Sequence, residues 1–439
     1  MRISLPYSRK KRYLSGMDWV IAALDLMNRR RTGGSNASQV VLELHGDFDE
    51  EKFKQAVTGL VDLFPVVGGR LARCWNLAPY WAMPPAGVRV EVPVESQTVT
   101  AATLHEALSQ SINTPFAGPE SHLAFKIFRL SPLHHFLVLR FDHCLLDAQG
   151  AEMLLDLLHC RIIGQAGSER MERISLIEPA HLSDWMRKFE AGRQLIRLLR
   201  PLVNQKIRTL PRPVPLKGRG FRFRVIEFNE QETEAITANA EREAGFMMLM
   251  PYLLASALES LDPVFKKRGE GAGDYLVTVS VDLRSPDMAQ ANLFFNHLSF
   301  LLFTIPTAIA GDRRQTVDLV KLQMYEQIKN GFPGALAESS MLMRILSRSL
   351  LGRLMLKPLN GEFASFSFSC VGKGGYRSAK FMNADVVNLF HMPLVPLPPG
   401  LGLVFNQYGT RMNATLTYLD GLLDQKNVED VDAHVRGRL

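Results

Sequence analysis

Cysteine is scarce in this chain of 439 residues. There are four cysteines, Cys74, Cys144, Cys160 and Cys370, and no two of them form a Cys-x-x-Cys pair. Cysteines so few and so widely spaced exclude a disulfide scaffold, and without Cys-x-x-Cys a zinc ribbon or a thioredoxin-like site has no support. We therefore expect reduced thiols, which are typical of a cytoplasmic protein.

Long apolar runs are also missing. The most apolar long stretch, residues 293–310, is interrupted by Asn296, His297 and Pro306, whereas a membrane-spanning helix needs ~20 mostly apolar residues. The basic residues at positions 9–12 are not followed by an apolar segment of signal-peptide length. The sequence contains no internal repeat and no low-complexity tract. These absences predict a cytoplasmic protein without a targeting segment.

The composition is that of a globular protein with a large core, because 46% of the residues are hydrophobic and 22% are charged. The net charge of +7 favours anionic partners. Between Arg187 and Arg224, twelve Lys and Arg residues accompany a single acid, Glu190. We interpret residues 181–220 as a basic helix and linker that separates an N-terminal lobe, residues 1–180, from a C-terminal lobe, residues 221–439. Strands and helices alternate in both halves, which predicts two α/β lobes.

The strongest candidate for chemistry follows a predicted strand over residues 136–141. That strand runs into a loop carrying His143 and Asp147, and an apolar helix follows at 151–160. Loops at strand ends are where rigid scaffolds place reacting groups. Imidazole titrates near ~6.5, and a positioned base contributes roughly 10²–10⁴ in rate. A histidine at a strand end can also make only a local hydrogen bond, so the spacing alone leaves both interpretations open.

The segment from His143 to Gly150 resembles the HxxxDG signature of the CoA-dependent acyltransferase superfamily. This superfamily includes chloramphenicol acetyltransferase, BAHD acyltransferases, alcohol acetyltransferases, wax ester synthases and nonribosomal-peptide condensation domains. Other segments with a resemblance to its members follow in the expected order, at residues 14–18 (LSGMD), 64–71 (FPVVGGRL), 281–284 (VDLR), 292–296 (NLFFN) and 369–372 (SCVG). Three departures concern the subfamily. Asp142 replaces the first His of condensation domains, Ala148 replaces the Gly after the Asp, and no DFGWG motif is present.

The resemblance implies two chloramphenicol-acetyltransferase-like α/β lobes with an active-site tunnel between them. It implies that His143 is the general base that removes a proton from an acceptor hydroxyl or amine. The acceptor then attacks the acyl thioester directly, with no acyl-enzyme. Asp147 would have a structural role, paired with Arg284.

The remaining site residues are candidates for stabilising the oxyanion or lining the tunnel. Gly150 and its neighbours begin a helix, where backbone N–H groups are free to act as donors, and Asn296 lies in an otherwise apolar stretch. The tunnel candidates are Ser367, Ser369, Asp142 and His297. His134 and His135 have no third ligand nearby in the sequence, so we interpret them as a strand-entry turn and expect no metal site. We expect no bound cofactor, with acyl-CoA as co-substrate.

The expected partners are acyl-CoA and a small-molecule or lipid acceptor. The basic segment is a solvated helix and linker, a docking surface for CoA phosphates or an acidic acyl carrier protein, or a peripheral membrane contact through residues 185–210. We expect no nucleic acid, because no recognition motif accompanies the charge.

Three functions compete on this sequence. The first is a CoA-dependent O- or N-acyltransferase of natural-product or lipid biosynthesis. The second is a condensation-type domain that takes its donor from a carrier protein, and the third is a catalytically degenerate relative that only binds. The retained His143 and Asp147 favour an enzyme.

Overall fold

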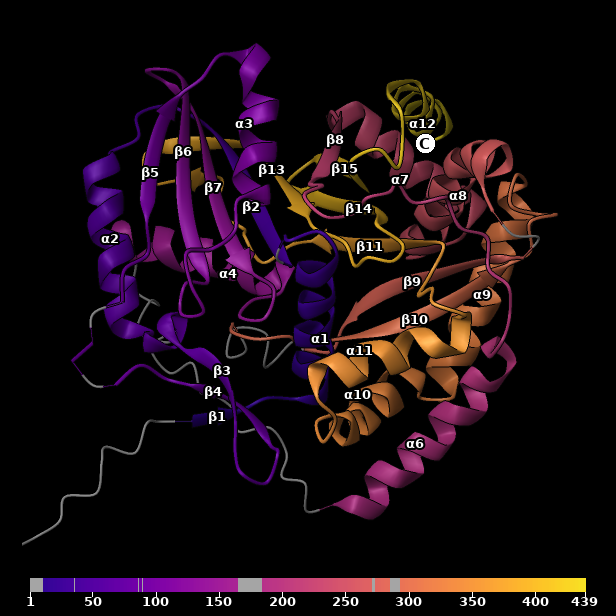
Figure 1. The fold of residues 1–439 in the computed structure, drawn as a ribbon. Coiled ribbons are helices and arrows are strands. Elements are labelled where there is room, and N and C mark those ends of the chain that lie inside the picture. The colour runs from indigo at the N-terminus through magenta and orange to yellow at the C-terminus, as the bar shows by residue number, and fades with distance from the viewer. Residues whose placement is uncertain are drawn as a thin grey trace, which may run out of the picture.

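The chain was analysed as a computed structural model, which describes residues 11–34, 36–85, 87–88, 90–164, 184–270, 273–284 and 293–439. Asn292 of the NLFFN segment and the expected lobe boundary at residue 180 lie outside this part. The described residues form two α/β lobes side by side (Figure 1), which confirms the predicted fold class.

The first lobe is built on a six-stranded sheet of order β12–β13–β2–β7–β6–β5. Its strands are β2 (Ala37–His45), β5 (Val94–Thr98), β6 (Leu123–Ser131), β7 (His134–Asp142), β12 (Lys380–Phe381) and β13 (Ala384–Pro393). One face packs against α2 (Glu50–Leu63) and α4 (Ala148–Ile162), with Val40 and Leu42 in the same core as Phe53 and Leu154. The other face packs on α3 (Ala101–Asn113) and the second lobe. Alternating side chains of β2 therefore serve two different cores.

The second lobe has a six-stranded sheet of order β10–β9–β11–β14–β15–β8. Its strands are β8 (Phe221–Phe228), β9 (Tyr275–Asp282), β10 (Leu298–Ile305), β11 (Phe366–Lys373), β14 (Leu401–Tyr408) and β15 (Arg411–Leu419). The helices α7 (Glu230–Glu243), α8 (Leu249–Arg268), α9 (Arg313–Lys329) and α12 (Gln425–Arg438) cover it. α8 is buried along most of its length, as expected for a helix with few polar positions.

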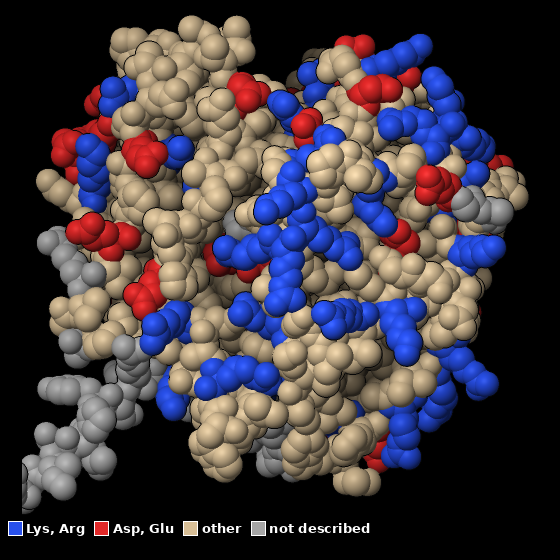
Figure 2. Space-filling view, in the orientation of Figure 1, with Lys and Arg blue, Asp and Glu red and all other residues tan. Residues whose placement is uncertain are grey.

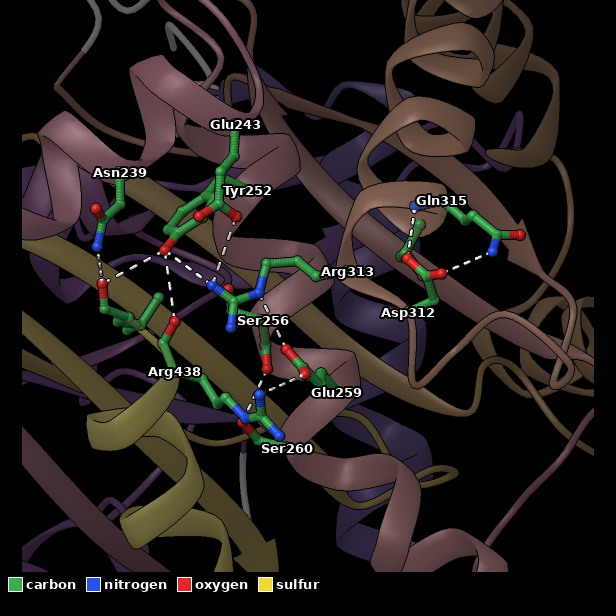
Figure 3. Close-up of polar contacts among 12 residues, drawn as sticks. Asn239, Glu243, Tyr252, Ser256, Glu259, Ser260, Asp312, Arg313, Gln315 and Arg438 are labelled. Carbon is green, nitrogen blue, oxygen red and sulfur yellow. Dashed lines mark hydrogen bonds and ion pairs between the residues drawn. The ribbon is translucent and has the colours of Figure 1, made fainter.

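A polar network fastens the helices of the second lobe to one another (Figure 3). Arg313 of α9 donates to Glu259 and to the hydroxyl of Tyr252, both on α8, at 3.0 Å in each case. The Tyr252 hydroxyl in turn donates to the carbonyl oxygen of Leu439, which follows α12. None of these residues lines the cavity described below, so this network has a structural role.

Helices also join the two lobes. α1 (Gly16–Arg31) packs against α10 (Phe332–Met343) and α11 (Arg348–Leu356). A Cβ atom at Gly16 would lie 2.1 Å from Ser340 Oγ, so only glycine fits where α1 meets α10. The basic helix α6 (Trp185–Leu199) lies along α10, and buried Lys188 pairs with Glu338 at 3.1 Å. A small sheet of β1 (Lys11–Tyr13), β4 (Pro79–Ala82) and β3 (Arg70–Arg73) completes the structure.

Two features concern how the halves of the chain are connected. β12 and β13 come from the second half of the chain, yet they lie in the sheet of the first lobe. The strand β10 begins only at Leu298, because Leu293, Phe294 and Phe295 before it pack into the core of the first lobe. The ranges 1–180, 181–220 and 221–439 stay a prediction. No helix in the described part of the chain is long and apolar enough to cross a membrane.

Candidate active site

The loop that carries His143 is held rigid by its neighbours. β7 ends at Asp142, and the His143 N–H donates to the Asn36 carbonyl at 3.2 Å. The buried Asp142 carboxylate accepts from the Cys144 N–H at 2.9 Å and contacts His122 Nδ1 at 3.0 Å. Burial alone would raise the pKa of Asp142, but the hydrogen bond and charge of His122 lower it below its ordinary value. Asp142 thus shapes the loop and does not line the cavity.

Asp147 is committed to structural contacts. It is the N-cap of α4, where its Oδ1 accepts from the Gly150 N–H at 2.9 Å and from Arg284 Nη2 at 2.8 Å. Its Oδ2 accepts from the His297 N–H at 3.1 Å. The Arg284 side chain is only 2% exposed and also pairs with Asp282. Burial would raise the pKa of Asp147, but the charge and hydrogen bond of Arg284 keep it below its ordinary value.

Gly150 is needed for close packing. Its N–H is already bound by Asp147, so it is not free to hold an oxyanion. A Cβ atom at this position would lie 2.2 Å from the Leu293 carbonyl oxygen. The glycine therefore allows the start of α4 to approach the segment that carries Asn296.

That segment is joined to the His143 loop through its backbone. The Phe295 N–H donates to the Leu145 carbonyl at 2.6 Å, and Phe295 forms an isolated parallel bridge with Leu146. Phe295 has a φ of +72°, an uncommon conformation for a bulky residue. Such conformations persist where the surroundings enforce them, and often at functional sites. Here the strained backbone places Asn296 beside His143.

The contacts of Asn296 define which nitrogen of His143 carries a proton. Asn296 Nδ2 faces two acceptors, the His143 carbonyl at 2.8 Å and Asp18 Oδ1 at 3.4 Å. Its Oδ1 therefore faces His143 Nδ1, at 2.9 Å. An amide oxygen can only accept, so Nδ1 carries the proton and the lone pair of Nε2 is free to accept another. This is the tautomer that a general base requires.

A buried ion pair supports Asn296 from behind. Asp18 Oδ1 also accepts from the Asn296 N–H at 3.0 Å, and Asp18 Oδ2 accepts from Arg12 Nη1 at 3.0 Å. Asp18 forms a capping box with Ser15 at the start of α1. The Arg12 guanidinium lies 3.5 Å from the centre of the Phe295 ring. Three segments far apart in the sequence, residues 12–18, 143–146 and 295–296, thus meet to fix one imidazole.

His143 lines a cavity of about 240 Å³ between the two lobes. Residues from both sheets contribute, and most of the lining is apolar. Ser367 and Ser369 of β11 line it, and Ser369 Oγ contacts Ser280 Oγ at 2.9 Å. Asp147 and Arg284 also reach it, whereas Asp142, Asn296 and His297 are not among its lining residues. The His297 ring contacts the Phe294 carbonyl, and burial lowers the pKa of His297.

The first two residues of α4, Ala148 and Gln149, both line the cavity. Within the described part of the chain, neither backbone N–H has an acceptor, because Asp147 binds only that of Gly150. Free N–H groups at a helix N-terminus stabilise negative charge.

Sequence reasoning assigned no role to Asp18 or Arg12, and for the oxyanion it named Gly150 and its neighbours without singling out Ala148 or Gln149. The LSGMD segment was the available signal for Asp18. Arg12 is two residues before that segment, and nothing in the sequence pattern distinguishes its charge from those of its basic neighbours.

Neither a protein-family profile nor a curated protein sequence matches this chain. Solved structures do match this chain. A first condensation domain of the calcium-dependent antibiotic synthetase is similar with a TM-score of 0.70 and 13% identity, covering 98% of this chain and 97% of that chain. The trichothecene 15-O-acetyltransferase of Fusarium sporotrichioides has a TM-score of 0.68 and 12% identity, covering 98% and 96%.

The condensation domain of the monacolin K polyketide synthase has a TM-score of 0.64 and 11% identity, covering 98% of this chain and 97% of that chain. At these identities the likeness concerns the fold over nearly the whole of each chain. The protein therefore has the two-lobed, chloramphenicol-acetyltransferase-like fold that condensation domains and the trichothecene acetyltransferase share.

Proposed function

We propose that the chain is an acyltransferase that moves an acyl group from a CoA thioester to a hydroxyl or amine acceptor, with His143 as general base. The observation that carries the proposal is the hydrogen bond from His143 Nδ1 to Asn296 Oδ1, beside a cavity between the lobes. It leaves Nε2 as the proton acceptor on a ring whose orientation is fixed by contacts among three distant segments of the chain.

The reaction needs no covalent enzyme intermediate. His143 Nε2 takes the proton as the acceptor oxygen or nitrogen attacks the thioester carbonyl. The N–H groups of Ala148 and Gln149 stabilise the resulting oxyanion. When the tetrahedral intermediate collapses, the C–S bond breaks and the imidazolium returns its proton to the leaving thiolate. Cys144 does not compete as a nucleophile, because burial, together with the charge of Asp142, raises the pKa of its thiol.

Basic residues near the cavity favour a donor that carries phosphate. Arg31, at the end of α1, donates to the carbonyl of Leu397, next to the lining residue Pro396. Arg212 pairs with Glu362, next to the lining residue Phe363. Lys and Arg side chains also gather near the middle of the face shown in Figure 2. Such a surface attracts the phosphates of CoA.

A carrier-dependent condensation reaction is the second candidate. It is favoured by the fold of the condensation domains described above, and a carrier-bound pantetheine also has a phosphate. A binding role without catalysis is the third, since the X-domain from teicoplanin biosynthesis, solved as a complex with OxyB, is similar in fold, with a TM-score of 0.58.

The test is a thiol-release assay with a panel of acyl-CoAs and mixed alcohols and amines. We expect release that depends on an acceptor and falls roughly 10²–10⁴-fold in His143→Ala. His434→Ala, an exposed position on α12, is the matched control and should retain full activity. Release only from an acyl-carrier protein would favour the condensation reaction. Equal rates in wild type and His143→Ala would contradict the role of His143.

A further inference from the structure

Three potential metal ligands meet at the end of the first-lobe sheet that is farthest from His143. Glu43 and His45 are on β2, and His134 is the first residue of β7. One ligand atom from each lies within 4.8 Å of the other two. Since β7 spans the nine residues from His134 to Asp142, the cluster is about 30 Å from His143 at ~3.3 Å per residue.

Strand pairing brings these residues together. His45 is directly opposite His134 in the β2–β7 register, and Glu43 is two residues earlier on β2. All three side chains therefore project from one face of the sheet. His135, by contrast, projects to the other face, where its Nε2 contacts the Pro132 carbonyl. The sequence offered no third ligand for His134 because the two missing ligands are on another strand.

The distances fit a transition-metal ion. His134 Nε2 lies 2.9 Å from Glu43 Oε1, and His45 Nε2 lies 3.6 Å from the same oxygen. Ligand atoms bonded to a tetrahedral Zn²⁺ at about 2.0–2.1 Å are roughly 3.3 Å apart. Two imidazoles and a carboxylate are among the ligand sets that bind zinc. The His45 and Glu43 side chains are 50% and 17% exposed, so an ion can reach them from solvent.

Next to the cluster lie two carboxylates whose mutual repulsion a bound cation would reduce. Asn388 of β13 is opposite Glu43 in the β13–β2 register, and it donates to Glu227 of β8 at 3.0 Å. Two carboxylates, one from each lobe, therefore lie near one another. Bound Zn²⁺ would offset their repulsion where the lobes meet.

We propose that Glu43, His45 and His134 form a Zn²⁺ site with three protein ligands and a fourth position open to water. The site belongs to the first lobe, borders the second and is separate from the cavity. If no metal binds at this site, the proposed acyl transfer is unaffected, because His143 is at the opposite end of β7.

The experiment titrates the full-length, metal-free protein with Co²⁺ and then with Zn²⁺ as competitor. We expect one equivalent per chain, with the visible absorption of tetrahedral Co²⁺ and no thiolate charge-transfer band. His45→Ala, His134→Ala and Glu43→Gln should each weaken binding at least about 10-fold, and His434→Ala should not. Zn²⁺ should raise the Tm of wild type and His434→Ala but not of His45→Ala.

Circular dichroism without metal checks that each variant is folded. His45 is half exposed at a strand end, so His45→Ala tests metal binding even if His134→Ala does not fold. Unchanged affinity in His45→Ala and Glu43→Gln would overturn the proposal, as would binding that shows thiolate charge transfer. Thiol release from acyl-CoA, measured on the same variants, separates this result from the proposed function.

Discussion

At the residue scale, the site depends on the hydrogen bonds between the Asn296 side-chain amide and His143. Asn296 accepts from His143 Nδ1 and donates to the His143 carbonyl. It touches the base and not the cavity, so it is a positioning residue. Without the Asn296 side chain, neither the tautomer nor the orientation of the His143 ring would be fixed.

We expect Asn296→Ala to lower kcat about 10- to 100-fold with little change in KM, because displacement of a reacting group costs rate more than binding. In a His143→Ala background, the same substitution should cause no further loss, since the two residues act as a unit. Steady-state kinetics on the double-mutant cycle tests this. Asn330→Ala, at the end of α9, is the control. Additive losses would mean that Asn296 acts independently of His143.

The ion pair of Asp147 with Arg284 predicts that the protein loses stability in acid. Removing it leaves the buried Arg284 without its main partner, which costs about 3–5 kcal/mol. The pKa of Asp147 is depressed in the folded protein, so its contribution is fully present above the unfolded value of ~3.9. That contribution disappears as the pH falls through the lower, folded pKa.

Urea unfolding of wild type and Asp147→Asn at several pH values measures this contribution. The difference in unfolding free energy should be large near neutrality and should shrink in strong acid. A difference that does not depend on pH, or comparable unfolding curves for Asp147→Ala and wild type, would argue against a structural ion pair.

At the scale of elements, α4 is fixed by a glycine loop that follows β11. A Cβ atom at Gly374 would lie 1.6 Å from Glu152 Oε2. Glu152 is buried and contacts His391 at 2.6 Å and the Tyr376 N–H at 3.1 Å. We expect Gly374→Ala to destabilise the protein by about 1–3 kcal/mol, because the carboxylate must move out of these contacts.

Gly59, inside α2, is the matched control. No atom lies within 4 Å of a Cβ atom placed there. Gly59→Ala should therefore stabilise the protein by about 0.5–1 kcal/mol, the difference between glycine and alanine in a helix. Thermal denaturation of both variants tests whether Gly374→Ala lowers the stability and Gly59→Ala raises it. If both variants lost stability equally, steric contact at Gly374 would not be the cause.

At the scale of the whole molecule, the two lobes share one chain in an interleaved way. β13 pairs with β2 along nearly its whole length, and Leu389 contributes to the first-lobe core. A fragment of residues 1–204 would expose the edge of β2 and part of that core, which favours aggregation. We expect this fragment to aggregate alone and to form a soluble complex when it is co-expressed with residues 205–439. Gel filtration tests this; a folded monomeric fragment would contradict it.

The sequence by itself determined the local parts of this protein. Alternation and helical periodicity indicated the strands and the helix around His143, and the HxxxD segment indicated the residue that would act as a base. The strand at residues 384–393 was not among the elements expected from the sequence, and the pattern of a strand does not identify the strand that it pairs with.

The tertiary structure alone decided which contacts complete the site. It brings Asp18 to Asn296 and Asn296 to His143, and it places Ala148 and Gln149 beside the cavity. Gly150 lost its assigned role because the Asp147 carboxylate binds its N–H. The metal ligands likewise come from two strands whose register the sequence does not fix. Local interactions follow from neighbouring residues, whereas contacts between distant segments depend on how the hydrophobic cores pack.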